Sequence, residues 1–593
     1  MSKQHEDFLP RASAAGPAQT TTVDVDNQAL ASRRGFLSGL GGMALATLAA
    51  GTTTVVSTAC EPSEEPADPE TPRAMARRIR SYQLRQQAAL DEYNLGIFHK
   101  RTNGDEERYP HRIGNYSKGL PHNDLGEVDP RAYDAMLRAL ASGRFEDFEA
   151  IPLGGRLRLT NPLGGLTYDL LGPDAAAVHL QPPPALASAE AAAQVAELYW
   201  MALCRDIPFT DYPTDPTIAA AITDLSRYSG YRGPRPITPQ TLFRLDSPGV
   251  LEGPMVSQFL LQPWTYDGIA IESRLQVPLP VTTGDGIDFM TSYDEWLAAQ
   301  RGFPVGTTIT PPRMDPVPRH IHNLRSLGQN AGADVHFTPY LRAALILLDL
   351  GDAALSDRNP YKSSRTQTGF ASFGPSHLLT LLGCLTRASH HGFYGKWFIN
   401  RYLRPDAFGG RVHNRRRGAA DYPIHPELLD SPVLDRIHAY NELVNRRRGL
   451  NDGQGSYLLP VMMPIGAPTD PAHPAGHSYT ASSRASLLKA WFKEDFVIPN
   501  PVKPNRDGTA LEPYVPGVDG PPLTVAGELN KLAHNTSMGR DAYGVHYRAD
   551  DIAGYRLGEE VAIRILREER ATYAESVFQG FAFTLLDGTP VEL

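Results

Sequence analysis

Apolar residues recur three and four positions apart over five long stretches of the chain, and this spacing is typical of amphipathic or buried helices. The five stretches are 187–206, 340–350, 376–403, 475–493 and 551–569. Alternating patterns typical of strands are few and short, and long connections rich in Pro and Gly, such as 499–520, separate the helices. The pattern therefore predicts a mainly α-helical bundle whose loops line a central site.

The amino-terminal sixty residues follow a different pattern. Arg33 and Arg34 precede an apolar stretch of small residues from Leu37 to Ala50, which is too short to span a membrane. This arrangement predicts a twin-arginine export signal over 1–60 and a periplasmic or extracellular protein. A chance arginine pair in a tail without structure is the alternative. Lipid attachment at Cys60 also stays open, because the preceding residues only loosely match a lipoprotein processing site.

The rest of the chain divides once more. Pro, Glu, Thr and Ser are frequent just after Cys60, so we predict a flexible linker over 61–87. No linker or repeat of fixed period interrupts the chain after that. Residues 88–593 are therefore predicted to form one large catalytic domain.

Composition narrows the class of function. The 593 residues are 41% hydrophobic and 21% charged with a net charge of -9, as expected for a globular enzyme. Basic residues are scattered apart from two short runs, Arg415–Arg417 and Arg446–Arg448, which are typical of solvated surface, so a nucleic-acid partner is not expected. Cys204 and Cys384 are too few for a disulfide framework, and buried free thiols are the simpler interpretation.

Candidate chemistry begins at the end of the stretch 376–403. Lys396 and Arg404 are eight residues apart, so on one helix they would lie on nearly the same face, and Pro405 would stop that helix. Two cations would then converge on one space. A lysine and an arginine on a helix are, however, commonly surface groups.

A second segment precedes the helix expected over 475–493. Backbone amides at a helix start are unsatisfied donors, and the small Ala475 and Gly476 would let an anion approach them, with His477 at the rim. His477 could equally serve as a capping group.

A third segment contains Arg540 and His546. Six residues separate them, which would place them on opposite sides of an unbroken helix, but Gly544 can end that helix and turn His546 back. Asp550 or Asp551 is then expected to cap the next helix. Two arginines, a lysine, a glycine amide and an imidazole suit a tetrahedral oxyanion such as phosphate or vanadate.

In this order the three segments resemble the Lys-x7-Arg-Pro, small-Gly-His and Arg-x5-His motifs of the superfamily that joins vanadium haloperoxidases to bacterial acid phosphatases and type-2 phosphatidic acid phosphatases. Five further segments look like the vanadium bromoperoxidases of red algae and their bacterial relatives: 103–106, 114–122, 197–203, 344–350 and 528–532. The resemblance covers about 88–566. It implies the large helical-bundle fold of that superfamily and oxidation of bromide or iodide by hydrogen peroxide, followed by halogenation of a small organic substrate.

The resemblance also implies a role for each matching residue. Equatorial oxygens of vanadate would be bound by Lys396, Arg404 and Arg540, and the amide of Gly476 would donate to them. His546 would ligate vanadium at the apex, and His477 would act as the acid-base residue. Lys396 would in addition polarise the bound peroxide for attack by halide.

Three positions depart from the family pattern. Ala475 replaces a serine whose hydroxyl bonds vanadate. Asp470 stands where bromoperoxidases commonly have a histidine, with His473 nearby, and Phe393 stands where relatives place Trp or Arg. A carboxylate near the halide path would repel an anion unless it pairs with His473 or Arg404. Phe393, Asp470 and His473 are therefore possible residues of the halide pocket, and the halide preference stays open.

Two other functions remain as alternatives. A phosphomonoesterase would use phosphate in place of vanadate and His546 as the nucleophile. An inactive anion-binding relative would follow if Ala475 and Asp470 prevented catalysis. The resemblance further implies a homo-oligomer, while the calcium sites of some algal relatives cannot be matched in this sequence.

Overall fold

The computed structural model describes residues 71–97, 101–284, 286–303, 312–332 and 337–593. The chain forms two units, Met1–Arg77 and Arg78–Leu593, and their boundary falls inside helix α2 (Thr71–Leu95). The prediction of a flexible linker is wrong from Thr71 onward, because the Ala-, Arg- and Gln-rich sequence there favours a helix. The export signal predicted over 1–60, with Cys60, lies outside the described residues.

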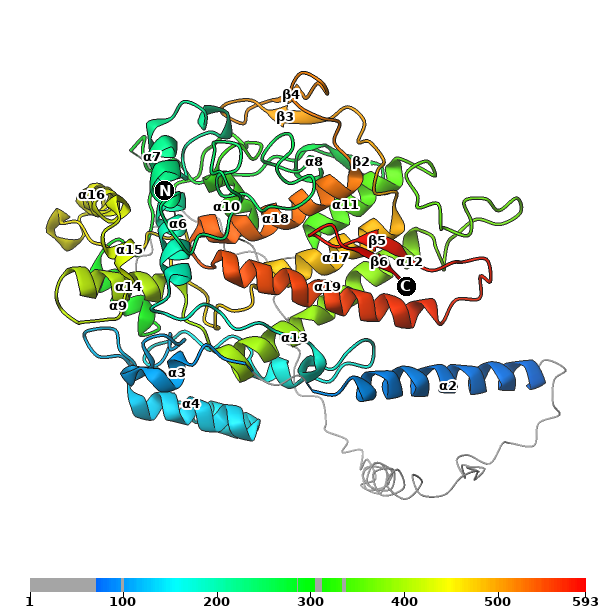
Figure 1. The fold of residues 1–593 in the computed structure, drawn as a ribbon, viewed down its shortest axis with the longest axis horizontal. Coiled ribbons are helices and arrows are strands. Elements are labelled where there is room, and N and C mark those ends of the chain that lie inside the picture. The colour runs from blue at the N-terminus through cyan, green and yellow to red at the C-terminus, as the bar shows by residue number, and fades with distance from the viewer. Residues whose placement is uncertain (1–70, 98–100, 285, 304–311, 333–336) are drawn as a thin grey trace, which may run out of the picture. The chain divides into compact units, whose positions relative to one another are not determined.

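The second unit is mainly helical (Figure 1). After α2, its α-helices are α3 (Asp105–Arg108), α4 (Pro130–Ser142), α5 (Phe145–Glu149), α6 (Ala189–Cys204), α7 (Pro216–Leu225), α8 (Gln258–Leu261), α9 (Tyr293–Gln300), α10 (Leu324–Ala331), α11 (Thr338–Asp349), α12 (Pro375–Cys384), α13 (Ala388–Tyr394), α14 (Pro405–Arg416), α15 (Pro426–Leu429), α16 (Pro432–Arg448), α17 (Gly476–Trp491), α18 (Val525–Tyr543) and α19 (Arg548–Arg570). The strands pair as antiparallel hairpins: β1 (Trp264–Tyr266) with β2 (Ile269–Ile271), β3 (Val502–Pro504) with β4 (Leu511–Pro513), and β5 (Ala582–Thr584) with β6 (Pro590–Glu592). The predicted mainly α class, with few short strands, is confirmed.

Four of the five predicted helices form close to their predicted bounds. They are α6, α11, α17 and α19. The prediction of one helix over 376–403 is wrong. The chain there forms α12, a 3-10 turn (Leu385–Arg387), α13 and a π-helical segment η7 (Gly395–Asn400). Apolar spacing alone does not register such changes of helical pitch, because each piece still repeats every three to five residues.

Helix α17 forms the centre of the bundle. Every residue from His477 to Trp491 is buried, and α17 packs against both α18 and α19, as Figure 1 shows. Glycines on α19 allow the close approach: a Cβ atom at Gly558 would lie 2.0 Å from the carbonyl oxygen of Tyr479. The helix that starts at the second candidate segment is therefore held on several sides.

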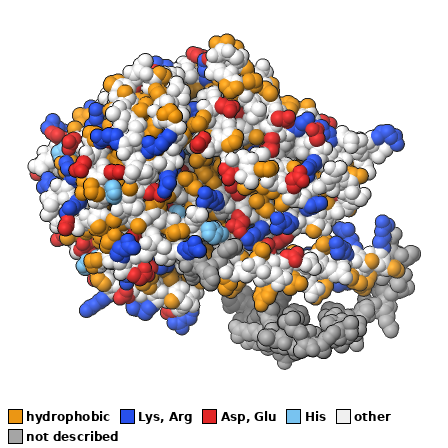
Figure 2. All heavy atoms as spheres, in the orientation of Figure 1, with side chains coloured by type: hydrophobic (Ala, Val, Ile, Leu, Met, Phe, Trp, Pro, Cys, Tyr) orange, Lys and Arg blue, Asp and Glu red, His pale blue; other side chains and the backbone are white. Residues whose placement is uncertain are grey.

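The surface agrees with the sequence interpretation, and the cysteines agree with it in part. Figure 2 shows basic and acidic side chains interspersed over the visible face, without a basic stripe. Cys204 is a buried free thiol and Cys384 a half-buried one. Among the described residues, none of the helices combines the length and the apolar character needed to cross a membrane.

Candidate functional site

The Lys396 segment turns sharply instead of continuing as a helix. The π-helical segment η7 ends at Asn400, and Arg401 adopts a left-handed conformation with φ 38°. The amide of Arg401 still donates to the carbonyl oxygen of Lys396 at 2.9 Å. This tight end reverses the chain and brings Arg404 back towards Lys396.

Pro405 starts helix α14 and does not stop the preceding one, so that prediction is wrong. Arg404 is the N-cap residue of α14, and Pro405 occupies the first turn, where a missing amide hydrogen costs nothing. The predicted convergence of Lys396 and Arg404 does occur. Its cause is the turn at Arg401 and not a shared helix face.

The turn at Arg401 is held by a segment that the resemblance identified without a role. Glu106 forms an ion pair with the Arg401 guanidinium, and Tyr133 donates a hydrogen bond to the same carboxylate at 2.5 Å. The amide of Tyr116 donates to the Arg401 carbonyl oxygen at 2.7 Å. Sequence reasoning assigned Glu106 no task, because its partner lies 295 positions away.

Ala475 begins the central helix. It is the N-cap residue of α17, is completely buried, and has no hydroxyl to cap the first turn. The following Gly476 is half-buried, while His477 is buried on the first turn. No side chain therefore caps the amides of this turn, and an uncapped helix start suits an anion.

The third segment follows its prediction. Arg540 lies in the last turn of α18, and Gly544 ends that helix in the left-handed conformation with φ 90°. His546 then precedes α19. The predicted cap is only partly right: Tyr547 is the N-cap residue of α19, and Asp550 accepts its backbone amide hydrogen at 3.2 Å.

Arg404 joins all three segments. Its Nε donates to the Asp470 carbonyl oxygen at 2.8 Å, and its Nη2 donates to the Asp470 carboxylate at 2.8 Å. Its Nη1 donates to the carbonyl oxygen of Val545 and to Nε2 of His546, both at 2.9 Å. One fully buried guanidinium therefore fixes the distance between the three motifs.

Lys396 shares a carboxylate with Arg404. Its Nζ lies 2.5 Å from Oδ2 of Asp470 and also donates to the Pro471 carbonyl oxygen at 2.8 Å. Burial lowers the pKa of Lys396 to about 8, although the charge of Asp470 opposes this shift. Burial would raise the pKa of Asp470, but the charges of Arg404 and Lys396 outweigh it and lower that pKa. The carboxylate thus pairs with Arg404, as the sequence allowed, but not with His473.

His546 is held as a neutral imidazole. Its Nδ1 lies 3.1 Å from Oδ2 of Asp550, and a carboxylate accepts, so Nδ1 carries the hydrogen and Nε2 presents its lone pair to Arg404. Burial lowers the pKa of His546 well below its usual range, and the charges of Arg404, Lys396 and Arg540 lower it further. A neutral imidazole with an available lone pair is the form that binds a metal.

Asp550 was missed as a functional residue. Its second oxygen, Oδ1, lies 3.1 Å from Nδ1 of His473, whose Nε2 lies 2.8 Å from the Gln181 carbonyl oxygen. Asp550 is completely buried between the two rings. The signal in the sequence was its position four residues after His546, which places it in the first turn of the next helix.

The remaining predicted residues, Arg540, His477 and Phe393, are buried to different degrees. Arg540 is buried and lies over the ring of Tyr543, and its Nη1 lies 3.4 Å from the carbonyl oxygens of Ala331 and Gly332. The charges of Arg540 and His477 both lower the pKa of His546. Phe393 is half-buried and packs against the apolar cluster around Trp397.

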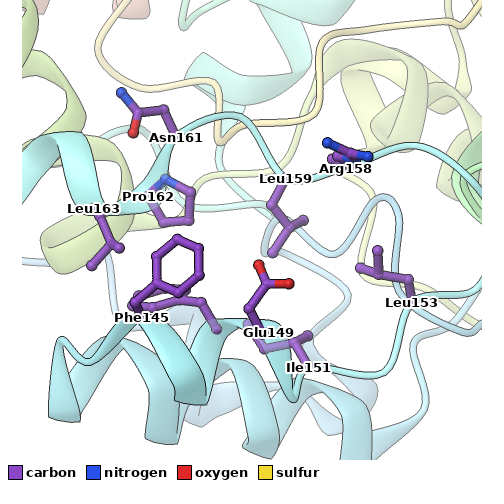
Figure 3. Close-up of a pocket in the computed structure, with 10 residues that line it drawn as sticks. Phe145, Glu149, Ile151, Leu153, Arg158, Leu159, Asn161, Pro162 and Leu163 are labelled. Atoms are coloured by element: carbon purple, nitrogen blue, oxygen red, sulfur yellow. The ribbon is translucent and has the colours of Figure 1, made fainter. Parts of the chain in front are cut away.

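The segment 158–163, which lines a surface cleft, is hydrogen-bonded to Thr469 and Trp397. Thr160 donates its amide to the Thr469 carbonyl oxygen at 2.7 Å, and Trp397 donates to the Thr160 carbonyl oxygen at 3.1 Å. The cleft of about 430 Å³ in Figure 3 is lined by Phe145, Phe148, Glu149, Ile151, Leu153, Arg158, Leu159, Asn161, Pro162 and Leu163. Its lining includes none of the residues predicted to bind vanadate.

Comparison with known proteins decides the family. The chain is 34% identical over 554 residues to a vanadium-dependent bromoperoxidase of Ascophyllum nodosum, covering 90% of this chain and 95% of that protein. It is 32% identical to the vanadium-dependent bromoperoxidase of Corallina officinalis, covering 89% of this chain and 100% of that protein. The chain belongs to the vanadium-dependent bromoperoxidase family.

Further comparisons agree with membership of this family. Residues 435–574 match the family model of the VCPO second helical-bundle domain. The solved homohexameric structure of the second vanadate-dependent bromoperoxidase (AnII) from Ascophyllum nodosum is similar, with a TM-score of 0.82, 30% identity, and coverage of 93% of this chain and 95% of that one. The phosphomonoesterase alternative is not favoured by these bromoperoxidase relatives.

Replacing Ala475 by serine is expected to tighten vanadate binding roughly ten- to hundredfold, because a hydroxyl at the N-cap position supplies the missing hydrogen bond, worth about 1–3 kcal/mol. Titration of the vanadate-free protein with orthovanadate measures this. Ala475→Gly is the matched control, since glycine is also a tolerated N-cap but has no hydroxyl. Equal affinity of the serine and glycine variants would contradict the prediction.

Two buried carboxyl groups lie on the helices that pack against α17. Asp541 of α18 and Asp551 of α19 hydrogen-bond each other, and Ser478 donates to Asp551 at 2.7 Å. Burial raises the pKa of Asp551 to about 7, and burial and the neighbouring Asp551 raise that of Asp541 well above its usual range. The folded protein therefore binds more protons here than the unfolded chain does, so this pair costs stability as pH rises from about 4 through 7 and beyond.

Asp541→Asn is expected to raise the unfolding temperature relative to wild type, and by more at pH 8 than at pH 5. The amide cannot ionise and can still donate to Asp551. Calorimetric unfolding of both proteins at the two pH values measures the difference. A difference that is the same at both pH values, or larger at pH 5, would show that the pair does not share a proton.

Proposed function

We propose that this protein is a vanadate-dependent peroxidase that oxidises bromide or iodide with hydrogen peroxide to hypohalous acid. The product would halogenate electron-rich small organic molecules. The observation that carries the proposal is the buried Arg404 guanidinium, which draws Lys396, Asp470 and the neutral His546 into one centre. The bromoperoxidase names of the relatives support bromide as the halide.

The donor set fits vanadate. Lys396, Arg404 and Arg540 offer three buried cations for the oxygens of a trianion, and the uncapped α17 start offers the Gly476 amide. The Nε2 lone pair of His546 is the one nitrogen ligand such a site needs. Asp550 accepts the Nδ1 hydrogen of His546, which keeps the ring in the tautomer that binds metal.

Bound vanadate would supply a Lewis-acidic vanadium(V) centre that activates hydrogen peroxide towards halide without changing its oxidation state. This chain's own groups would do the rest. Lys396 would donate a hydrogen bond to the reacting oxygen, and His477, on the first turn of α17, would take a proton from peroxide and return it. The overall reaction consumes one bromide, one peroxide and one proton and yields hypobromous acid and water.

Halide selection would fall to the residues that depart from the family pattern. Asp470 is neutralised by Arg404 and Lys396, so its charge does not stand unopposed near an incoming anion. His473 has partners on both ring nitrogens, which supports a positioning role for it through Asp550. Phe393 packs against the apolar cluster that contains Trp397 and would contribute an apolar wall.

One assay set tests the proposal. The purified protein, with and without orthovanadate, is given peroxide, bromide and a phenolic halogen acceptor, and in parallel a chromogenic phosphate ester. Bromination that requires vanadate, with little ester hydrolysis, is the expected result. Ester hydrolysis without bromination would assign the protein to the phosphatases, and inactivity in both assays would indicate an anion-binding relative.

We further propose export through the twin-arginine pathway, to the periplasm or the exterior. Arg33 and Arg34 with the apolar stretch after them support it. Replacing both arginines by lysine is expected to retain the protein in the cytoplasm, as cell fractionation measures. Unchanged export would refute this assignment.

We also propose that the protein is a homo-oligomer. The homohexameric relative from Ascophyllum nodosum supports this, since it matches most of the chain. Light scattering on the purified protein tests it, and a monomer at micromolar concentration would refute it.

A further inference from the structure

Helix α2 carries a stripe of large apolar side chains that are exposed to solvent. Ile79 is 51% exposed, Tyr82 65%, Leu90 50% and Tyr93 82%. Successive residues of this set are three, eight and three positions apart, which places them on one face of the helix. The helix is about 37 Å long at 1.5 Å per residue. An exposed row of large apolar side chains of this length is typical of an interaction surface.

The opposite face of α2 already has its contacts. The half-buried residues of the helix are Ser81, Leu84, Ala88 and Glu92, which also follow helical spacing. Glu92 pairs with Arg564 of α19 at 3.3 Å. The apolar stripe therefore lies on the face of α2 opposite the contact with α19.

The stripe is symmetric about Gln86. Tyr82 and Leu90 each lie four residues from Gln86, and Ile79 and Tyr93 each lie seven. Two more exposed apolar residues continue the pattern at eleven residues on either side: Met75 within α2, and Ile97 just beyond its end. Read in either direction, the stripe has the same spacing.

We infer that α2 pairs in antiparallel orientation with α2 of a second copy of this chain, with the two-fold axis at Gln86. This inference rests on the proposed homo-oligomer and names one of its interfaces. A two-fold axis brings the same patch of both subunits together, so each apolar residue of the stripe meets an apolar residue of the other copy. Tyr82 then meets Leu90, Ile79 meets Tyr93, and the polar Gln86 meets itself and sets the register.

Charge selects the antiparallel orientation. Five arginines precede Gln86 in α2, and the acidic residues Asp91 and Glu92 follow it. Parallel pairing would place these arginines of the two helices side by side, whereas antiparallel pairing separates them; of the two acidic residues, Glu92 already pairs with Arg564.

Cysteine cross-linking tests the axis. Gln86 is exposed, so Gln86→Cys leaves folding intact and is expected to give mostly disulfide-linked dimer on mild oxidation, seen on a non-reducing gel. Gln87→Cys is the matched control, because it lies on the same turn about 100° away from the stripe and contains the same native cysteines. Equal cross-linking of the two variants, or none at Gln86 in a protein that is oligomeric by light scattering, would overturn the inference.

A second variant tests the stripe itself. Tyr82→Glu combined with Leu90→Glu is expected to raise the dissociation constant of the α2 interface at least tenfold, while bromide oxidation per subunit stays unchanged. Gln83→Glu, a single acidic change beside the stripe, should leave association almost intact. An unaltered oligomer in the double variant would contradict the inference but would not bear on the proposed activity. Binding of α2 to anionic vesicles, in a protein that gives no cross-link at Gln86, would also contradict it.

Discussion

Replacement of His546 by alanine is expected to abolish vanadium retention and bromide oxidation together. His546 Nε2 is the only nitrogen atom proposed to ligate vanadium, and alanine also removes the ring that accepts from Arg404 at 2.9 Å. We expect the variant to lose at least a thousandfold in activity at vanadate concentrations that saturate the wild type. Metal analysis after dialysis, combined with the peroxidase assay, measures both effects.

The matched control is the neighbouring imidazole. His477→Ala removes a buried histidine from the first turn of α17 but leaves His546 and the three cations in place. This variant should therefore retain vanadium and lose turnover, because it lacks only the group proposed to move the proton. Full metal content and activity in His546→Ala, or loss of metal in His477→Ala alone, would reverse the two roles.

Asp470→Asn is expected to have the second largest effect. It should destabilise the vanadate-free protein and strengthen vanadate binding. Asp470 neutralises Arg404 and Lys396, so its removal leaves two buried cations without their carboxylate. We expect the vanadate-free variant to lose about 3–5 kcal/mol of stability. Vanadate should in turn bind at least tenfold more tightly, about 1.4 kcal/mol, because the net positive charge of the site rises by one.

Thermal unfolding with and without orthovanadate measures both parts of this prediction. Vanadate should raise the unfolding temperature of Asp470→Asn by more than that of wild type. Asp134→Asn, which removes the same charge from the exposed face of α4, is the control and should change neither quantity. A variant that is as stable as wild type without vanadate would show that Asp470 does not balance the two cations.

Much of the fold follows from the sequence pattern. Helices α6, α17 and α19 appear within three residues of the predicted bounds, because each has a long apolar repeat with a clear end. Gly544 was correctly predicted to end α18, since only a glycine takes the left-handed conformation without strain. The helical class and the order of the three motifs were therefore readable from the chain alone.

The errors have different physical causes. Pro405 permits either the end of one helix or the start of the next, and the structure uses it as a start because Arg401 turns the chain before it. That turn depends on Glu106, far away in the sequence, so no local pattern reports it. The helix at Thr71 was missed for a local reason: the acidic, Pro-rich composition ends where the helix begins, but the predicted linker was extended to residue 87.

The sequence by itself determined which groups this protein brings to its site: a lysine, two arginines, an uncapped helix start and two histidines. Only the tertiary structure decided how they are paired. Asp470 lies between Lys396 and Arg404, and Asp550 lies between His546 and His473. The physical reason is that residue type sets the charge and donors of a group, whereas its protonation and orientation are set by burial and by partners from distant parts of the chain.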